Sequence, residues 1–236
     1  MGSIKRTARI AGVLYLLNGV TSGFAFAYVL ARVYVGGDAA LTAANVVANS
    51  VLVRIGVVAD LFQATVWIFL GMTLYLLLKH VNKNMAGTMV VLVAVGAAIV
   101  CLNDVFQIAT VRVATDASYA AAFGVAGSNA LVLLLLDIHH YGFLIAQIFF
   151  GLWLMPLGYL SYRSGMFPKL LGIALMVGGA CYLVGLLAVF LVPDVGEKIN
   201  AFVTIPSAIA EIWMVFYLLV VGVRTVKPDD RVPSPS

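Results

Sequence analysis

The sequence has few charged residues. Asp, Glu, Lys and Arg occupy 10% of its 236 positions, whereas hydrophobic residues occupy 63%. A soluble domain typically carries about a quarter charged residues, so this composition excludes a water-soluble globule and indicates an integral membrane protein. A transmembrane helix needs about 20 apolar residues to cross about 30 Å of hydrocarbon. The chain is therefore long enough for six such helices with short connections.

Other scarcities argue against particular chemistries. No G-x-x-x-x-G-K-[ST] loop is present, which argues against nucleotide hydrolysis. Only three histidines occur, and His80 lies at the predicted cytoplasmic edge, so two histidines cannot hold a haem at the bilayer centre. The cysteines, Cys101 and Cys181, lie within apolar runs, where a free thiol packs as a small hydrophobic side chain. The net charge of +4 implies no nucleic-acid partner, because the positions of the basic residues relative to the lipid bilayer account for it.

Six apolar runs predict an all-α polytopic fold with six transmembrane helices in three hairpins. Five runs cover about residues 8–30, 57–78, 85–106, 170–191 and 202–223, and the other follows Asn129 and ends near Arg163. Outside the bilayer we predict a short amphipathic helix over 36–50, capped by Asp38, and a surface helix or loop over 110–129. Residues 1–225 would form a single transmembrane domain, followed over 226–236 by a Pro-rich cytoplasmic tail that we expect to be disordered.

The basic residues predict the orientation. If the amino terminus is inside, ten of the 14 Lys and Arg residues fall on the cytoplasmic side, and only Arg32, Arg54, Arg112 and Lys198 fall outside. This asymmetry follows the positive-inside rule. We therefore predict that both termini are cytoplasmic and that the protein crosses the inner (plasma) membrane several times.

Most acidic residues fall on the opposite side. A helix rises about 1.5 Å per residue, so the separation of each acid from the inner basic residue that ends its helix gives a height. This height is about 28 Å for Asp60, about 31 Å for Asp104, about 39 Å for Asp137 and only about 20 Å for Glu211. Three carboxylates are thus predicted at the outer boundary, with Glu211 deeper in the hydrocarbon, where an ionisable side chain normally faces the bundle interior and a partner.

Helical periodicity predicts that these acids share one outward-facing pocket with other polar side chains. At 100° per residue, Asp137 lies on the same face as His140, Tyr141 and Gln147, whereas His139 points about 200° away. Only one of the two adjacent histidines is then expected to join the pocket. The predicted ligand-binding residues are Asp60, Asp104, Asp137, His139, His140, Tyr141, Gln147 and Glu211.

Three functions remain open for these residues. The main prediction is a site for a cation or a small polar ligand, in transport or sensing, because a ring of acids concentrates cations. The second is a hydrolase at the outer leaflet with a divalent metal held by His139, Asp137 and Glu211, since His and carboxylate ligands suit zinc-activated water. No His-x-x-x-His or Glu-x-x-His spacing supports this second prediction. The third is a structural or stress-related membrane protein, in which Arg54 and Arg112 neutralise two of the acids.

Several motifs also resemble those of a known family. They include Ala-Arg-Ile-Ala-Gly at 8–12, Arg-Ile-Gly-Val-Val-Ala-Asp at 54–60, Leu-Asp-Ile-His-His-Tyr-Gly at 136–142, Ala-Gln-Ile-Phe-Phe-Gly-Leu-Trp at 146–153, and Pro206 with Glu211. Over about residues 6–224 the chain resembles the bacterial multi-spanning membrane proteins filed as domain of unknown function 4386. The resemblance implies six membrane helices without an assigned activity, and it favours His139 over His140 as the characteristic histidine. Neither the ligand nor the oligomeric state follows from it.

Overall fold

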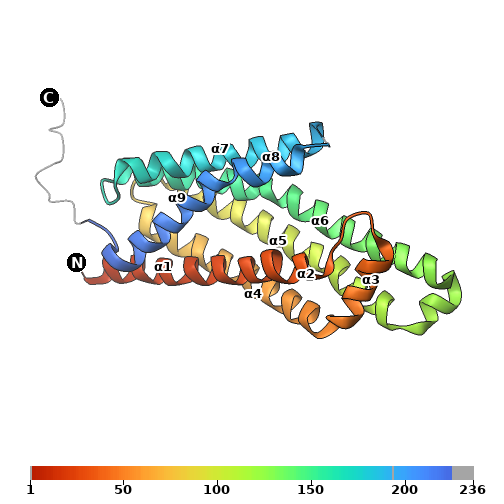
Figure 1. Cartoon of the computed structure of the whole chain (residues 1–236). Coiled ribbons are helices and arrows are strands. Elements are labelled where there is room, and N and C mark those ends of the chain that lie inside the picture. Colours follow the sequence, from red (N-terminus) through yellow and green to blue (C-terminus); the bar gives the residue numbers. More distant parts are fainter. Residues whose placement is uncertain (1, 193, 225–236) are drawn as a thin grey trace, which may run out of the picture. The chain divides into compact units, whose positions relative to one another are not determined.

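The computed structural model describes residues 2–192 and 194–224, and the elements defined there are helices (Figure 1). Six helical segments are long and apolar enough to cross a membrane: Ser3–Val33, Ser50–Leu78, Lys83–Thr115, Ala117–Ser164, Lys169–Leu191 and Gly196–Val221. This confirms the predicted all-helical architecture with six candidate membrane helices. The direction in which they cross stays a prediction, and the predicted tail over 226–236 lies outside the described residues.

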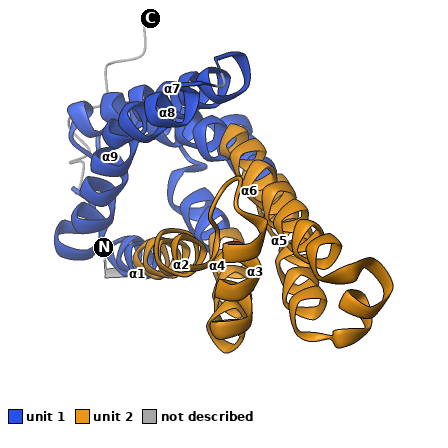
Figure 2. Ribbon diagram, turned by 45° about the vertical axis from the view of Figure 1, so that its right-hand side comes forward, with its two compact units in different colours: residues 1–13, 70–92, 150–236 blue, residues 14–69, 93–149 orange. Residues whose placement is uncertain are grey.

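The chain divides into two compact units (Figure 2). Unit 1 comprises residues 1–13, 70–92 and 150–236, and unit 2 comprises residues 14–69 and 93–149. Several long helices contribute residues to both units. The predicted single transmembrane domain over residues 1–225 stays a prediction.

The first membrane segment changes its helical geometry along its length. It comprises α1 (Gly2–Ser22), the π-helix η1 (Gly23–Leu30) and the short α2 (Ala31–Val33). Asp38 then caps α3 (Ala39–Ala48), because its side chain accepts a hydrogen bond of 2.9 Å from the backbone N–H of Leu41. The predicted short helix and its cap are thus confirmed.

The next three helices are longer than predicted. They are α4 (Ser50–Leu78), α5 (Lys83–Thr115) and α6 (Ala117–Ser164). Residues 110–115, predicted outside the third membrane helix, continue α5, whereas residues 117–123 form a largely exposed helical segment that a break at Gly124, where φ is 72°, separates from the rest of α6. The predicted end of the third helix was wrong because Val111 and Val113 are buried and belong to the hydrophobic core of unit 2.

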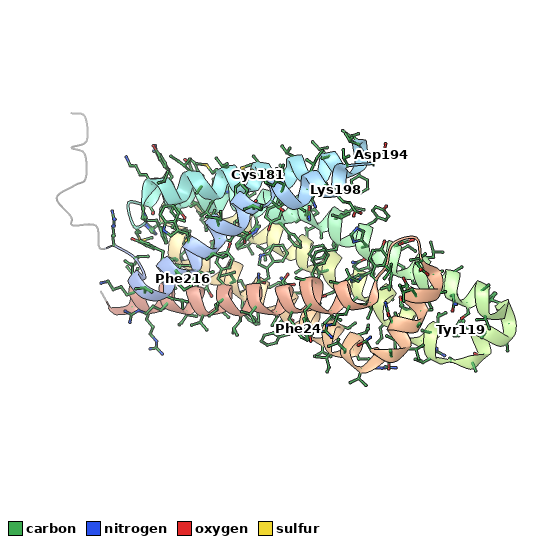
Figure 3. All side chains as sticks on the ribbon, in the orientation of Figure 1. Phe24, Tyr119, Cys181, Asp194, Lys198 and Phe216 are labelled. Carbon is green, nitrogen blue, oxygen red and sulfur yellow. The ribbon has the colours of Figure 1, made fainter. Side chains whose placement is uncertain are left out.

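That core joins residues from most helices of unit 2. Its buried members are Val29, Leu30, Val33, Ala43, Val46, Val53, Val111, Val113, Val132 and Leu136. Phe24 and Tyr119, labelled in Figure 3, are partly buried and pack against it. The α5 and α6 segments beyond the predicted helix ends are therefore stabilised by the same core that holds α3 against the bundle.

Unit 1 contains the remaining helices. These are α7 (Lys169–Leu191), α8 (Gly196–Val203), α9 (Ile205–Phe216) and the π-helix η2 (Tyr217–Val221). The sixth membrane segment was predicted as one helix over 202–223, but it begins at Gly196 and is interrupted at Thr204. Pro206 explains the interruption, because proline lacks a backbone N–H and starts a helix more readily than it continues one.

Two glycine pairs bring α6 close to α7 in unit 1. A Cβ at Gly151 would lie 2.7 Å from the carbonyl oxygen of Gly179, and a Cβ at Gly158 would lie 2.6 Å from that of Gly172. Small residues at such positions permit the close backbone approach on which helix association in membranes depends. Cys181, also on α7 (Figure 3), is a free thiol, as is Cys101 on α5.

Candidate functional site

The predicted site residues are distributed over four helices. Asp60 is on α4, Asp104 on α5, Asp137, His139, His140, Tyr141 and Gln147 on α6, and Glu211 on α9. The first seven belong to unit 2, whereas Glu211 belongs to unit 1. Each group is therefore described within its own unit.

Asp60 and Asp104 lie at the same level of the α4–α5 pair. The two antiparallel helices touch where the Trp67 ring packs on Gly96, since a Cβ at Gly96 would lie 2.6 Å from that ring. Seven residues correspond to about 10 Å of helix. Seven residues from this contact, in the same direction along both helices, lie Asp60 on α4 and Asn103, the neighbour of Asp104, on α5.

Both carboxylates are inside the unit. Asp60 is 7% exposed and Asp104 3% exposed, because each occupies the stripe of its helix that otherwise packs against neighbours. Within residues 2–192 and 194–224, neither carboxylate oxygen of Asp104 has a hydrogen-bond partner. One turn further along α5, the buried Oε1 atom of Gln107 also lacks a donor in these residues. The structure thus gathers oxygen acceptors here without matching donors.

The amide next to Asp104 has a different environment. Asn103 Nδ2 donates to the backbone oxygen of His139 at 2.7 Å and lies 3.2 Å from His139 Nδ1. Both side chains are buried, and Gly142 leaves room for the amide, because a Cβ there would overlap it. Sequence analysis missed Asn103, although an amide within an apolar helix and beside an acid is a usable signal.

Asp137 and His140 converge on a tyrosine that sequence analysis also missed. The Tyr34 hydroxyl donates to Asp137 Oδ1 at 2.7 Å, and the Tyr34 ring stacks on His140 with a centroid separation of 5.3 Å. The Thr42 hydroxyl holds the loop after Tyr34 by bonding both the N–H and the carbonyl of Val35. No sequence signal links Tyr34 with a residue 103 positions away.

The other two unit 2 candidates lie apart from the acid pair. Tyr141 is exposed and lines an open, mostly apolar groove of about 580 Å³ between α5 and α6, together with Asp137 and Asn103. Gln147 is buried, and its Oε1 atom has no partner among the described residues. Phe149 contacts Gly96, so Gln147 lies about 9 Å along the bundle from the level of Asp104. It is therefore a separate acceptor.

Glu211 is partnered within unit 1. The Tyr182 hydroxyl on α7 lies 3.2 Å from Glu211 Oε1, and the Tyr182 ring packs edge-on against Phe150. A tyrosine donor at this distance fits the expectation that an acid in a membrane helix has a partner in the bundle.

Among the described residues, no complete set of ligands for the predicted metal comes together. In the part of the chain that the structure describes, no three His, Cys, Asp or Glu side chains gather in a way that could hold a metal ion. The predicted ligands also have other contacts, since His139 bonds Asn103 and Asp137 accepts from Tyr34. A metal at these residues stays a hypothesis.

Comparison with known proteins identifies the family. The family model described as domain of unknown function (DUF4386) matches residues 10–222. The chain belongs to the DUF4386 family. This confirms the resemblance found in the sequence, and it agrees with the multi-pass membrane helices of the structure. No curated protein and no solved structure matches the chain.

Arg54 and Arg112 of this DUF4386 protein, which were predicted on the outer side, make no hydrogen bond to the Asp104 carboxylate in the described chain. Both oxygens of Asp104 lack a hydrogen-bond partner in the described chain, and Arg54 and Arg112 are exposed. Arg112 acts instead on Asp116 in the loop between α5 and α6. Hydrogen bonds from the side chain and then the backbone N–H of Ser118 lower the pKa of Asp116, and the charge of Arg112 lowers it further.

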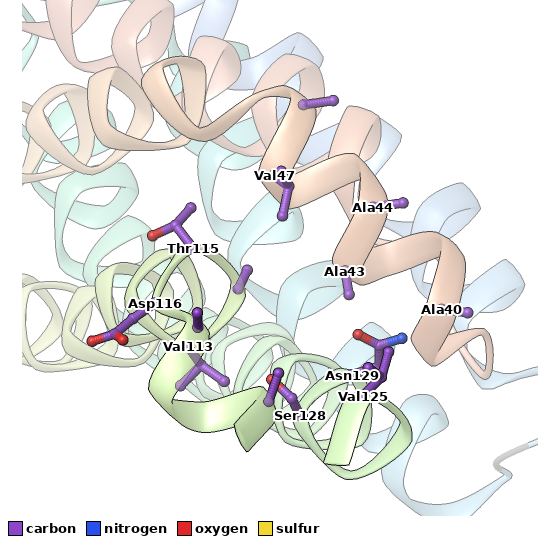
Figure 4. Close-up of a pocket in the computed structure, with 14 residues that line it drawn as sticks. Ala40, Ala43, Ala44, Val47, Val113, Thr115, Asp116, Val125, Ser128 and Asn129 are labelled. Atoms are coloured by element: carbon purple, nitrogen blue, oxygen red, sulfur yellow. The ribbon is translucent and has the colours of Figure 1, made fainter. Parts of the chain in front are cut away.

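A further groove of the DUF4386 protein lies beside the candidate residues without including them. It has a volume of about 590 Å³ and is lined by small side chains of α3, by the end of α5 and by the first part of α6 (Figure 4). Ala43 and Val47 line it from α3, Asp116 lines it between α5 and α6, and Ser128 lines it from α6. None of the predicted site residues lines this groove.

Proposed function

We propose that this DUF4386 protein binds a cation or a small polar ligand in transport or sensing, with Asp60 and Asp104 as the charged ligands. One observation carries the proposal. Asp104 is a buried carboxylate whose oxygens have no hydrogen-bond partner in the described chain, and a second buried carboxylate, Asp60, lies at the same level of the neighbouring helix.

Burial explains why a cation belongs there. An isolated carboxylate inside a protein costs several kcal/mol unless a positive charge or a proton neutralises it. Two neighbouring carboxylates need neutralisation more, because their charges also repel. A metal ion, a proton or a ligand ammonium group would remove both costs.

The neighbouring acceptors favour a hard cation if the ligand is a metal ion. Gln107 adds an amide oxygen one turn from Asp104, and this oxygen also lacks a donor in the described chain. Carboxylate and carbonyl oxygens are the ligands that magnesium, calcium and manganese prefer. Histidine contributes little at this position, because His139 Nδ1 contacts Asn103.

The side from which the cation enters follows from the proposed orientation. With both termini in the cytoplasm and the protein in the inner membrane, Asp60 and Asp104 lie about 28 and 31 Å from the inner basic ends of their helices. That height corresponds to the outer boundary of the hydrocarbon. The site is therefore proposed to exchange its cation with the outer side.

Thermal unfolding of the purified full-length protein tests the site. The protein is titrated with sodium, potassium, magnesium, calcium, manganese or zinc chloride, and the midpoint is compared with that of Asp104→Asn. A ligand at about 100 times its Kd stabilises the folded state by about 2.7 kcal/mol, so binding raises the midpoint. The shift should disappear in Asp104→Asn and persist in Asp116→Asn, a matched control in an exposed loop.

A proton is the remaining cation. Infrared spectroscopy detects a protonated carboxyl group directly, and the band assigned to it should disappear in Asp104→Asn. If no cation shifts the midpoint and Asp104→Asn changes no carboxyl band, the proposal is wrong. Uptake of the active cation into proteoliposomes then separates transport from sensing.

A further inference from the structure

Arg54 and Arg112 share an open groove in unit 2. The groove has a volume of about 650 Å³, and Val105, Ile108, Ala109, Thr115 and Asp116 complete its lining. Both arginines are exposed, and neither donates a hydrogen bond to the buried oxygens of Asp104 in the described chain, whereas the charge of Arg112 acts on Asp116 in the same groove.

The two guanidinium groups come from neighbouring levels of the α4–α5 pair. The contact between Trp67 and Gly96 places Arg54 level with Ala109, and Arg112 follows one turn later, about 4.5 Å along the axis. Side chains as long as arginine bridge such a separation readily. A single anionic group can therefore contact both guanidinium groups.

The part of the groove wall next to the arginines is apolar and is exposed on the surface of unit 2. Val105 is 56% exposed and Ile108 is 37% exposed, and Leu102, one turn beyond Val105, is 67% exposed. These residues lie in a candidate membrane helix, so their exposed surface meets lipid chains. Arginines at the end of such a face lie where lipid headgroups begin.

We propose that this groove binds the phosphate of an anionic phospholipid, with one acyl chain along Val105 and Leu102. A guanidinium group donates two parallel hydrogen bonds to phosphate oxygens, which makes arginine well suited to this anion. The charges also match. Two arginines and Asp116 leave the groove with a single positive charge, and a phosphodiester lipid without an amine carries a single negative charge.

Asp116 sharpens this preference. Its Oδ1 atom already accepts hydrogen bonds from the N–H and the hydroxyl of Ser118, at 3.0 and 2.7 Å. It also interacts with Arg112. A zwitterionic lipid brings its own positive charge to a groove that is already positive overall. The structure therefore favours phosphatidylglycerol-type lipids over phosphatidylcholine.

Native mass spectrometry of the purified full-length protein tests the proposal. The protein is titrated with phosphatidylglycerol, phosphatidylethanolamine or phosphatidylcholine with identical acyl chains. Both lipids offer the same phosphate oxygens, but phosphatidylcholine also brings a positively charged choline to a groove that is already positive, so the wild type should bind phosphatidylglycerol at least about tenfold more tightly than phosphatidylcholine. The double variant Arg54→Gln/Arg112→Gln should lose that preference.

Arg32→Gln is the matched control. Arg32 is an exposed arginine of the same unit, but its guanidinium group lies over the Tyr28 ring at 4.5 Å. This variant should bind phosphatidylglycerol as the wild type does. If the double Gln variant does not fold, Arg54→Lys/Arg112→Lys replaces it, and its affinity should fall because lysine cannot donate the parallel pair of hydrogen bonds.

Four outcomes overturn the proposal. The first is equal binding of phosphatidylglycerol and phosphatidylcholine by the wild type, which would show that lipid charge is not recognised. The second is tighter binding of phosphatidylethanolamine than of phosphatidylglycerol, which would show that Asp116 recognises an amine. An equal loss of affinity in Arg32→Gln shows a general effect of surface charge. Displacement of the bound lipid by inorganic phosphate at equal concentration shows a free-phosphate site.

Discussion

Gly142→Ala should destabilise unit 2 by acting on the Asn103–His139 contact. A Cβ at Gly142 would overlap the side-chain amide of Asn103. Asn103 must then either remain and compress the α5–α6 contact, or rotate away and lose its bonds to the His139 oxygen and Nδ1. The less costly of these responses sets the loss of stability.

The two responses have similar magnitudes. Overpacking a core by one methyl group costs about 1–3 kcal/mol. Hydrogen bonds between membrane helices contribute about 0.6–2 kcal/mol each, and Asn103 makes two contacts to His139. Replacing a helical glycine by alanine returns up to about 1 kcal/mol through helix propensity. We therefore expect a net destabilisation of about 1–2 kcal/mol from Gly142→Ala.

Denaturant unfolding in mixed micelles, followed by tryptophan fluorescence, measures this value. Gly87→Ala on α5 is the control, because nothing lies within 4 Å of a Cβ there, and it should be neutral or stabilising. In an Asn103→Ala background the overlap is gone, so Gly142→Ala should also become neutral or stabilising. Equal costs of Gly142→Ala in both backgrounds would refute the contact.

Three further variants test other parts of the structure. Gly158→Leu should push α6 away from α7 at Gly172 and lower the free energy of unfolding by about 3 kcal/mol or more. The protein should then lose its monodisperse peak in size-exclusion chromatography. Tyr34→Phe keeps the ring on His140 but removes the hydrogen bond to the Asp137 carboxylate. The free energy of unfolding should fall by about 1.5–3 kcal/mol, which is measured as a lower thermal midpoint. Ser118→Ala should raise the pKa of Asp116 towards its ordinary value. Because the folded pKa of Asp116 is depressed, its stabilising effect is present above the unfolded pKa of 3.8 and is lost as the pH falls through the lower folded value. The difference in thermal midpoint between wild type and Ser118→Ala should therefore be full at neutral pH and vanish in acid.

The helices were predictable because hydrophobic length is a strong signal. Six apolar runs predicted six candidate membrane helices, and Asp38 was predicted as the cap of α3. The helix ends were less predictable. Residues 110–115 were assigned outside the third helix because Thr110 and Arg112 are polar, yet Val111 and Val113 of the same turn are buried in the core of unit 2. Periodicity within one segment does not show which distant helices will cover it.

The candidate site was predictable in its charges but not in its partners. Asp60 and Asp104 were singled out because helix rise places both at the predicted outer boundary, and the structure buries both. Tyr34 and Asn103 were missed because their roles come from contacts with α6. The face argument did group Asp137 with His140, and both contact Tyr34. It also separated His139, which contacts Asn103 instead.

Two adjacent residues on α5 show how satisfied and unsatisfied polar groups differ in a membrane bundle. Asn103 donates to His139, so replacing either residue by alanine removes a contact and should lower stability. Asp104 lacks donors in the described chain, so Asp104→Asn removes a buried charge and should leave the protein without cation at least as stable. A buried carboxylate without hydrogen-bond donors gains a stabilising partner when a cation binds to it. This is the basis on which we propose ligand binding by the carboxylates, whereas His139, the histidine favoured by the family resemblance, contacts Asn103 and holds α6 against α5.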